Sequence, residues 1–121
     1  LGLQDRVHLL NRYIPNEEVP TLFEAADLCV LPYKQATQSG IVQVAYALET
    51  PVVVTRVGGI PEVVDDGVTG LLAEPDSPQS VAEQIARFFE QDLSDALKEG
   101  IATKQRQLSW GKLVEALQRL I

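Results

Sequence analysis

The chain has 121 residues, enough for one domain with a hydrophobic core but close to the lower limit for a doubly wound sheet. Apolar residues make up 45% and charged residues 22%, as in ordinary soluble globular proteins. The net charge of -7 argues against a nucleic-acid partner, because phosphate backbones demand clustered Lys and Arg. A nucleotide ligand is not excluded, since backbone N–H groups and helix N-termini hold phosphates without net positive charge.

Cys29 is the only cysteine, so by itself it forms neither an internal disulfide nor a zinc site. It lies in the apolar run 28–31, where we expect a buried core thiol. No apolar run approaches the roughly 20 residues of a membrane span, and no signal peptide is recognisable. We therefore expect a cytoplasmic protein. The start at Leu1 indicates a piece of a longer parent protein, for which peripheral association with a membrane stays open.

The sequence alternates short β-branched runs with helical periods, which is typical of βα units and a parallel sheet. A first short strand is expected at 7–10. The Asn-Glu-Glu run at 16–18 favours a helix start, and Pro20 is compatible with the first turn of that helix. The nearly continuous apolar run 27–32 predicts a second strand, of the kind that is buried on both faces.

The middle of the chain predicts one helix and two further strands. The runs 51–55 and 70–73 predict the third and fourth strands. Between them, 61–64 allows only a short helical turn, and the Asp-Asp-Gly run at 65–67 predicts a tight turn. A helix is expected over 39–48, with one apolar stripe at helical spacing. The stripe consists of Ile41, Val44, Ala45 and Leu48.

The rest of the chain is predicted to be helical, with 91–121 as the helical tail of a single domain over 1–121. Ser109 is the expected N-cap of a last helix that carries Trp110. We interpret every apolar stripe in this part as core packing. The stripes are Val81, Ile85, Phe88 and Phe89; Leu93, Leu97 and Ile101; and Trp110, Leu113, Val114, Leu117 and Ile121.

Two loops are candidate ligand sites, because ligands of open parallel sheets bind beyond the carboxyl ends of the strands. They are 33–39, after the second predicted strand, and 56–61, after the third. Free N–H groups and the positive end of a helix dipole predict an anion site at the end of the first loop. A plain serine N-cap explains the same residues equally well. These residues are Thr37, Gln38, Ser39 and Gly40.

The second loop contains Gly58 and Gly59, beside another helix start and between Arg56 and Glu62. Two such loops on neighbouring strand ends favour an anion-binding edge more strongly than either loop alone. The spacing matches neither a P-loop nor a GxGxxG fingerprint. We expect the two glycines to shape the floor of the site.

Several catalytic classes are unsupported by the sequence. His8, the only histidine, falls in a predicted strand, so no Ser-His-Asp arrangement is indicated. Neither candidate loop holds a carboxylate pair for acid–base hydrolysis. A receiver domain would need an acidic cluster at strand ends, whereas Asp27 opens a predicted strand and 65–66 lies in a turn.

Several runs of the sequence match one known family in the correct order. They are Ala25–Asp27 with Val30–Tyr33, then Pro51–Thr55, Gly58–Val64 and Asp66–Leu72. From about Leu3 to Phe89 the chain resembles the group 1 glycosyltransferases, also called glycosyltransferase family 4. The run from Pro51 to Leu72 is the most specific part of the resemblance.

The resemblance implies part of the second, donor-binding domain of a two-domain retaining enzyme. Its fold is a three-layer Rossmann-like parallel sheet, here of about four strands, with helices on both faces. The implied substrate is a nucleoside diphosphate sugar, with no metal and no cofactor required. The backbone amides of Gln38, Ser39 and Gly40 would face the diphosphate. The implied partners are this donor and an N-terminal acceptor domain that the chain lacks.

The sequence departs from the family at two glutamates. Counted back from Pro51, they would stand at positions 44 and 36, which are Val44 and Ala36 here. The family's first glutamate assists the sugar and its phosphate, and its second holds the ribose. Gln35 and Gln43 lie next to these positions and keep hydrogen-bonding capacity without charge. Catalytic residues are therefore left unassigned, and Gln43 is the candidate ribose contact.

Two βα units that precede this region in the family are also missing, with their Gly-Arg strand end and phosphate-binding Lys. The strand at 7–10 could pair directly with 27–32, or a partner chain could fill the gap. We expect self-association through the uncovered sheet edge. The leading interpretation is the donor side of a glycosyltransferase, inactive in isolation, and the alternative is a non-catalytic fold fragment or scaffold with at most weak nucleotide affinity.

Overall fold

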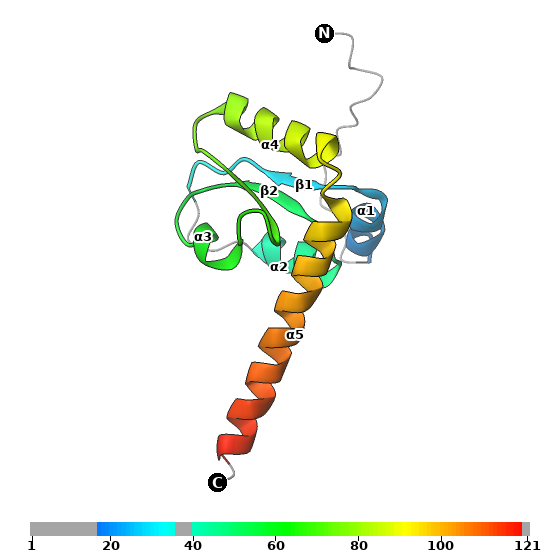
Figure 1. Cartoon of the computed structure of the whole chain (residues 1–121), viewed down its shortest axis with the longest axis vertical. Coiled ribbons are helices and arrows are strands. Elements are labelled where there is room, and N and C mark those ends of the chain that lie inside the picture. The colour runs from blue at the N-terminus through cyan, green and yellow to red at the C-terminus, as the bar shows by residue number, and fades with distance from the viewer. Residues whose placement is uncertain (1–16, 36–39, 120–121) are drawn as a thin grey trace.

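The computed structural model describes residues 17–35 and 40–119, with the side chains of all of these except 108–116 and 119. Within these ranges it is an α/β structure with a parallel sheet (Figure 1). The elements, in chain order, are α1 (Val19–Ala25), β1 (Cys29–Leu31), α2 (Gly40–Ala47), β2 (Val52–Thr55), α3 (Ile60–Val63), β3 (Gly70–Ala73), α4 (Pro78–Glu90) and α5 (Ser94–Arg119).

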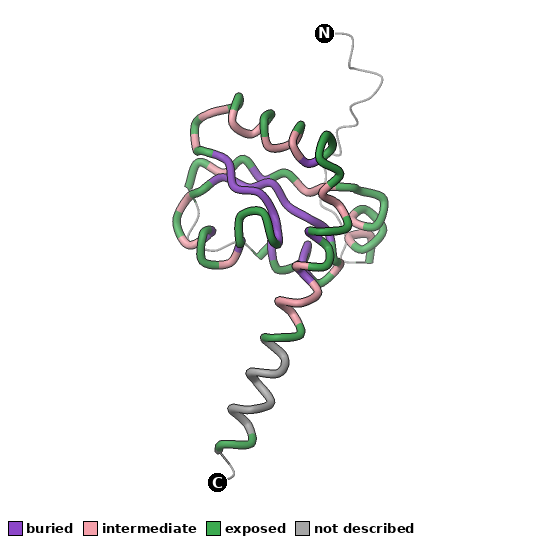
Figure 2. The backbone as a smooth tube through the Cα atoms, in the orientation of Figure 1, coloured by how far each residue is buried: buried purple, intermediate pink, exposed green. Residues whose placement is uncertain are grey.

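The three described strands lie in chain order, β1-β2-β3, and both pairs are parallel. Val53 of β2 is level with Val30 on one side and Leu71 on the other. Every residue of β2 and β3 is buried, because β2 has a neighbour on each side and both strands have helices above and below. Figure 2 shows this buried centre as the purple strands.

Successive strand residues point to opposite faces, so the sheet supports two separate cores. On one face, Val52, Val54 and Leu72 pack with residues of α2, α3 and α5. On the other face, Val53 and Leu71 pack with Phe88 and Leu97, and with partly buried residues of α4. The predicted three-layer arrangement with helices on both faces is confirmed.

The structure confirms the strand at 70–73 and shortens two others, to Val52–Thr55 and Cys29–Leu31. The expected strand at 7–10, which contains His8, lies outside the described residues. The prediction that 27–32 is buried on both faces is wrong, because only Leu31 is buried and Val30 is 37% exposed. Val30 shares a face with Val53, but no described helix covers β1 there as α4 covers β2.

The apolar stripe predicted for the helix after β1 is partly wrong. Helix α2 buries Val42, Ala45 and Tyr46, whereas Ile41 is 46% and Val44 is 38% exposed. Apolar residues occur around much of this short helix, so more than one helical stripe fits the sequence. The stripe that faces Val52 and Val54 is the one whose members are buried.

The first helix begins at Val19 and has Pro20 in its first turn, as expected, but Glu18 makes no side-chain cap. Phe89 was expected in the core, but it is 58% exposed. Its ring lies edge-on to that of buried Phe88, with the two ring centroids 5.0 Å apart. Ser109 is not an N-cap, because α5 runs without a break from Ser94 to Arg119. Its second half extends away from the sheet (Figure 1).

A polar network joins α2, α3 and α5 on one face of the sheet. The Tyr46 hydroxyl donates to the carbonyl of Val63 (2.9 Å) and lies 2.7 Å from the Thr69 hydroxyl. Lys104 of α5 donates to the same carbonyl (2.9 Å) and pairs with Asp65 (3.2 Å). Burial raises the pKa of Tyr46 to about 12, so its hydroxyl stays protonated and keeps both contacts at neutral pH.

Candidate functional site

Two helices follow neighbouring strands at the carboxyl edge of the sheet. Helix α2 begins at Gly40 after β1, and α3 begins at Ile60 after β2. Because the strands are parallel and adjacent, both connections leave from the same edge. Of the first predicted loop, Thr37, Gln38 and Ser39 lie outside the described residues. Gly40 and Gln43 are described, and both are exposed.

At Gly40, a methyl group in place of the hydrogen would meet no atom of the described residues within 4 Å. Among the described residues, none crowds the position of this methyl group. Gln43 lies less than one turn further along this helix, with an exposed side chain. Val44, the position of the absent family glutamate, is likewise exposed and not part of the core.

The second predicted loop makes a tight turn into α3. Gly58 has a φ of 51°, in the left-handed region that glycine adopts without cost, and Gly59 is the N-cap residue of α3. Arg56, at the start of the loop, lies 3.5 Å from Glu74 in the connection after β3. That ion pair joins the loops that follow β2 and β3, and both of its side chains are largely solvent-exposed.

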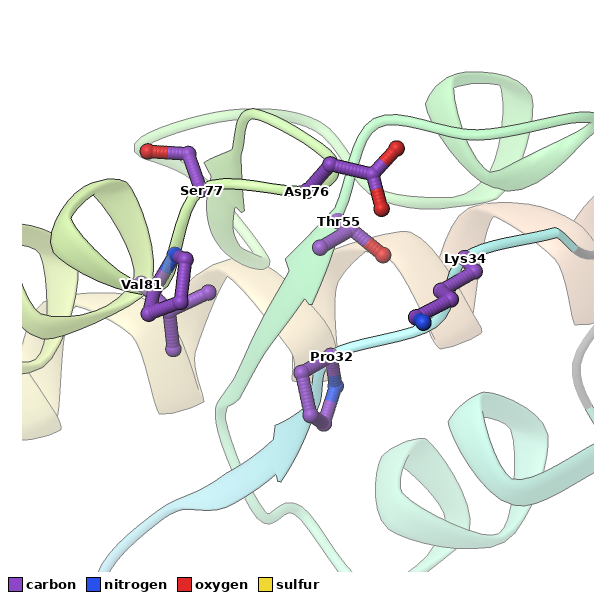
Figure 3. Close-up of a pocket in the computed structure, with 7 residues that line it drawn as sticks. Pro32, Lys34, Thr55, Asp76, Ser77 and Val81 are labelled. Carbon is purple, nitrogen blue, oxygen red and sulfur yellow. The ribbon is translucent and has the colours of Figure 1, made fainter.

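A hollow of about 400 Å³ opens at the same edge and was not predicted (Figure 3). We call it the edge hollow. Its wall comes from the residues after β1, from the end of β2, and from the start of α4. The lining residues are Pro32, Lys34, Thr55, Asp76, Ser77, Pro78 and Val81.

The polar groups of the edge hollow differ in what they already bind. The buried Thr55 hydroxyl donates to the carbonyl of Tyr33 at 2.6 Å, which fixes the chain leaving β1 against β2. The Ser77 hydroxyl accepts from the Ser80 N–H at 3.1 Å as the N-cap of α4. Lys34 and Asp76 are exposed, and neither side chain has a partner among the described residues.

Sequence reasoning missed Thr55, Asp76 and Ser77 because it considered only the loops after two strands. The same carboxyl-end rule applies to the connection after β3, where Asp-Ser-Pro at 76–78 is a strong helix-start signal. The hollow itself joins three segments that are far apart in the sequence. No local pattern reports that they meet.

The described residues include one thiol and several carboxylates. Among them, no group of three or more His, Cys, Asp or Glu side chains could hold a metal ion. Burial raises the pKa of the half-buried Cys29 thiol, which keeps it protonated and a poor nucleophile at neutral pH. None of the described helices is long and apolar enough to cross a membrane.

Comparison with known proteins assigns relatives to most of the chain. The family model described as "Glycosyl transferases group 1" matches residues 1–91. The D-inositol 3-phosphate glycosyltransferase of Mycolicibacterium smegmatis is 36% identical over 118 residues, which are 97% of this chain and 26% of that protein. The enzyme of the same name from Corynebacterium jeikeium is 34% identical over 107 residues, covering 88% of this chain and 26% of that protein.

Solved structures have the same fold. Anabaena HepE in complex with UDP-glucose matches all of this chain and 34% of its own, with a TM-score of 0.78 and 23% identity. Sucrose-phosphate synthase from Thermosynechococcus elongatus matches 98% of this chain and 32% of its own, with a TM-score of 0.71 and 26% identity. The chain thus spans about a quarter to a third of the length of the proteins that it matches.

Proposed function

The chain belongs to the group 1 glycosyltransferases, and from this premise we propose that it forms the donor-binding side of an enzyme that transfers a sugar from a nucleoside diphosphate sugar. The observation that carries the proposal is the pair of helix starts at one sheet edge, at Gly40 and Ile60. Relatives at 34% and 36% identity are named glycosyltransferases, which supports the reaction class. A cytoplasmic location and a second, acceptor-binding domain belong to the same proposal.

In this proposal the chain acts by positioning and by stabilising charge on the leaving diphosphate. The backbone amides of Gln38, Ser39 and Gly40 hold the diphosphate at the start of α2, with the hydroxyls of Thr37 and Ser39 beside them. Because Gly58 and Gly59 have no side chains, the neighbouring turn leaves room for the donor and forms the floor of the donor site. Gln43, exposed on α2, reaches the ribose as a neutral hydrogen-bonding group. No residue of this chain is assigned as acid or base.

Ser39→Pro tests the diphosphate assignment, because it removes one backbone N–H from the start of α2. We expect binding of UDP and GDP, measured by titration calorimetry on the 121-residue chain, to fall at least tenfold. Ser39→Ala is the matched control, since it deletes the hydroxyl but keeps the amide. We expect Ser39→Ala to lose much less affinity than Ser39→Pro. Wild-type affinity in the proline variant would refute the assignment.

The second candidate function is a non-catalytic fold fragment or scaffold. The observation that favours it is the pair of apolar residues, Ala36 and Val44, where the family has glutamates. Exposure of Val44 means that no core requirement explains the substitution. A wild-type chain that binds neither UDP nor GDP would support this alternative, whereas measurable binding of either supports the donor site.

A further inference from the structure

We propose that the edge hollow binds the sugar and the adjoining phosphate of the donor, with Asp76 accepting from sugar hydroxyls and Lys34 facing the phosphate. The inference rests on the proposed donor-binding function and extends it to residues outside the predicted site. The hollow lies at the same carboxyl edge as the start of α2 (Figure 3). Its volume of about 400 Å³ falls in the range of small-molecule sites.

Among the described residues at the carboxyl edge of the sheet, Lys34 is the cation whose side chain has no ion-pair partner. Arg56, the other cation there, already pairs with Glu74 at 3.5 Å. Lys34 lies three residues beyond the end of β1 and has no partner among the described residues. In a chain of net charge -7, a local positive charge offsets part of the repulsion of an anionic ligand, and an ammonium group is a common phosphate contact.

Asp76 supplies the opposite chemistry in the same hollow. Its carboxylate accepts hydrogen bonds and donates none, so a ligand group beside it must be a donor. Sugar hydroxyls are such donors, whereas a second phosphate would be repelled. Asp76 also has a φ of 56°, a conformation that Asp adopts more readily than most residues, and it lies two residues before the start of α4.

The apolar lining of the edge hollow suits the carbon skeleton of a sugar. Pro32, Pro78 and Val81 line the hollow with rigid or β-branched side chains. A hollow with an apolar lining, one cation and one carboxylate matches a sugar phosphate better than a free inorganic anion or a purely apolar ligand. Thr55 and Ser77 complete the wall, and their own hydrogen bonds hold it in place.

Calorimetry of the 121-residue chain with UDP, UDP-glucose and α-glucose 1-phosphate tests the inference in two variants. Lys34→Gln should weaken all three ligands about tenfold, because each carries a phosphate. Asp76→Asn should leave UDP unchanged or slightly tighter, since it removes a negative charge. The same variant should lower the ratio of UDP-glucose to UDP affinity about fivefold, because the sugar loses a charged acceptor.

Two controls match these variants. Lys98→Gln removes an exposed lysine that lines a different hollow, beside Glu49 and Thr50. Asp92→Asn changes another exposed Asp with positive φ (50°), at the opposite end of α4. Both controls should bind all three ligands as the wild type does.

The results separate this inference from the donor-site proposal. Nucleotide binding that is indifferent to Lys34→Gln and Asp76→Asn overturns the inference and leaves the donor site standing. Binding of glucose 1-phosphate that depends on Lys34, without any binding of UDP or GDP, supports the hollow and refutes the nucleotide site. A wild-type chain that binds none of these ligands overturns both.

Discussion

At Gly100, α5 passes close to the backbone of Val68 in the turn before β3. A Cβ atom built there would overlap the carbonyl oxygen of Val68 and lie 2.8 Å from its carbonyl carbon. These are backbone atoms, so no side-chain rotation relieves the overlap. Glycine at this position therefore lets the helix approach the turn, at the expense of the helix propensity that alanine would add.

We expect Gly100→Ala to lower the free energy of unfolding by about 1 to 3 kcal/mol, because overpacking outweighs the gain of about 1 kcal/mol in helix propensity. Urea denaturation followed by circular dichroism measures the change. Gly40→Ala is the control, since a methyl group there, at the start of α2, meets no atom of the described part of the chain within 4 Å. Equal stability of the two variants would contradict the close contact of α5.

At the scale of elements, Ser77 and Ser109 occupy different positions relative to the helices α4 and α5. Ser77 caps α4 through a 3.1 Å bond from the Ser80 N–H, whereas Ser109 lies inside α5. Ser77→Ala should therefore cost about 1 kcal/mol in the free energy of unfolding. Ser109→Ala should leave it unchanged or raise it by about 0.5 kcal/mol, because alanine is the better interior residue. Destabilisation of similar size in both variants would restore the predicted helix start at Ser109.

The elements that the sequence predicts well are those whose surroundings are uniform. Strands β2 and β3 are buried on both faces, so every residue is apolar or small and the runs are unmistakable. Strand β1 and helix α2 have one side each without a described neighbour. There the burial of Val30, Ile41 and Val44 depends on what lies beside them, which no local pattern encodes. The edge hollow is beyond prediction for the same reason, because three distant segments form it.

For the whole molecule, the outer edge of β1 is the feature that favours association. In the parallel register with β2, the backbone N–H of Cys29 donates to the carbonyl of Pro51 (2.9 Å). The backbone N–H of the next residue, Val30, therefore points to the unpaired side of β1. No described strand pairs with that side. Val30 itself is 37% exposed, and an exposed apolar residue on an open edge is a ready contact for a second strand.

Self-association is expected to occur through this edge of β1. We expect the chain to form oligomers at high concentration, measured by light scattering after size-exclusion chromatography, and Val30→Lys to shift them to monomers. Phe89→Lys is the control, because Phe89 is an exposed apolar residue of α4 and not of the sheet edge. A wild-type chain that stays monomeric at high concentration would refute the proposal.

The hydroxyl of Tyr46 helps to fix the relative position of α2 and α3. It joins α2 to α3 through the carbonyl of Val63, at the ends of the two helices that lie away from Gly40 and Gly59. The hydrogen bond therefore fixes the distance between these ends of α2 and α3. Because α2 and α3 follow neighbouring strands, this bond also limits how far the first turns of the two helices can lie apart.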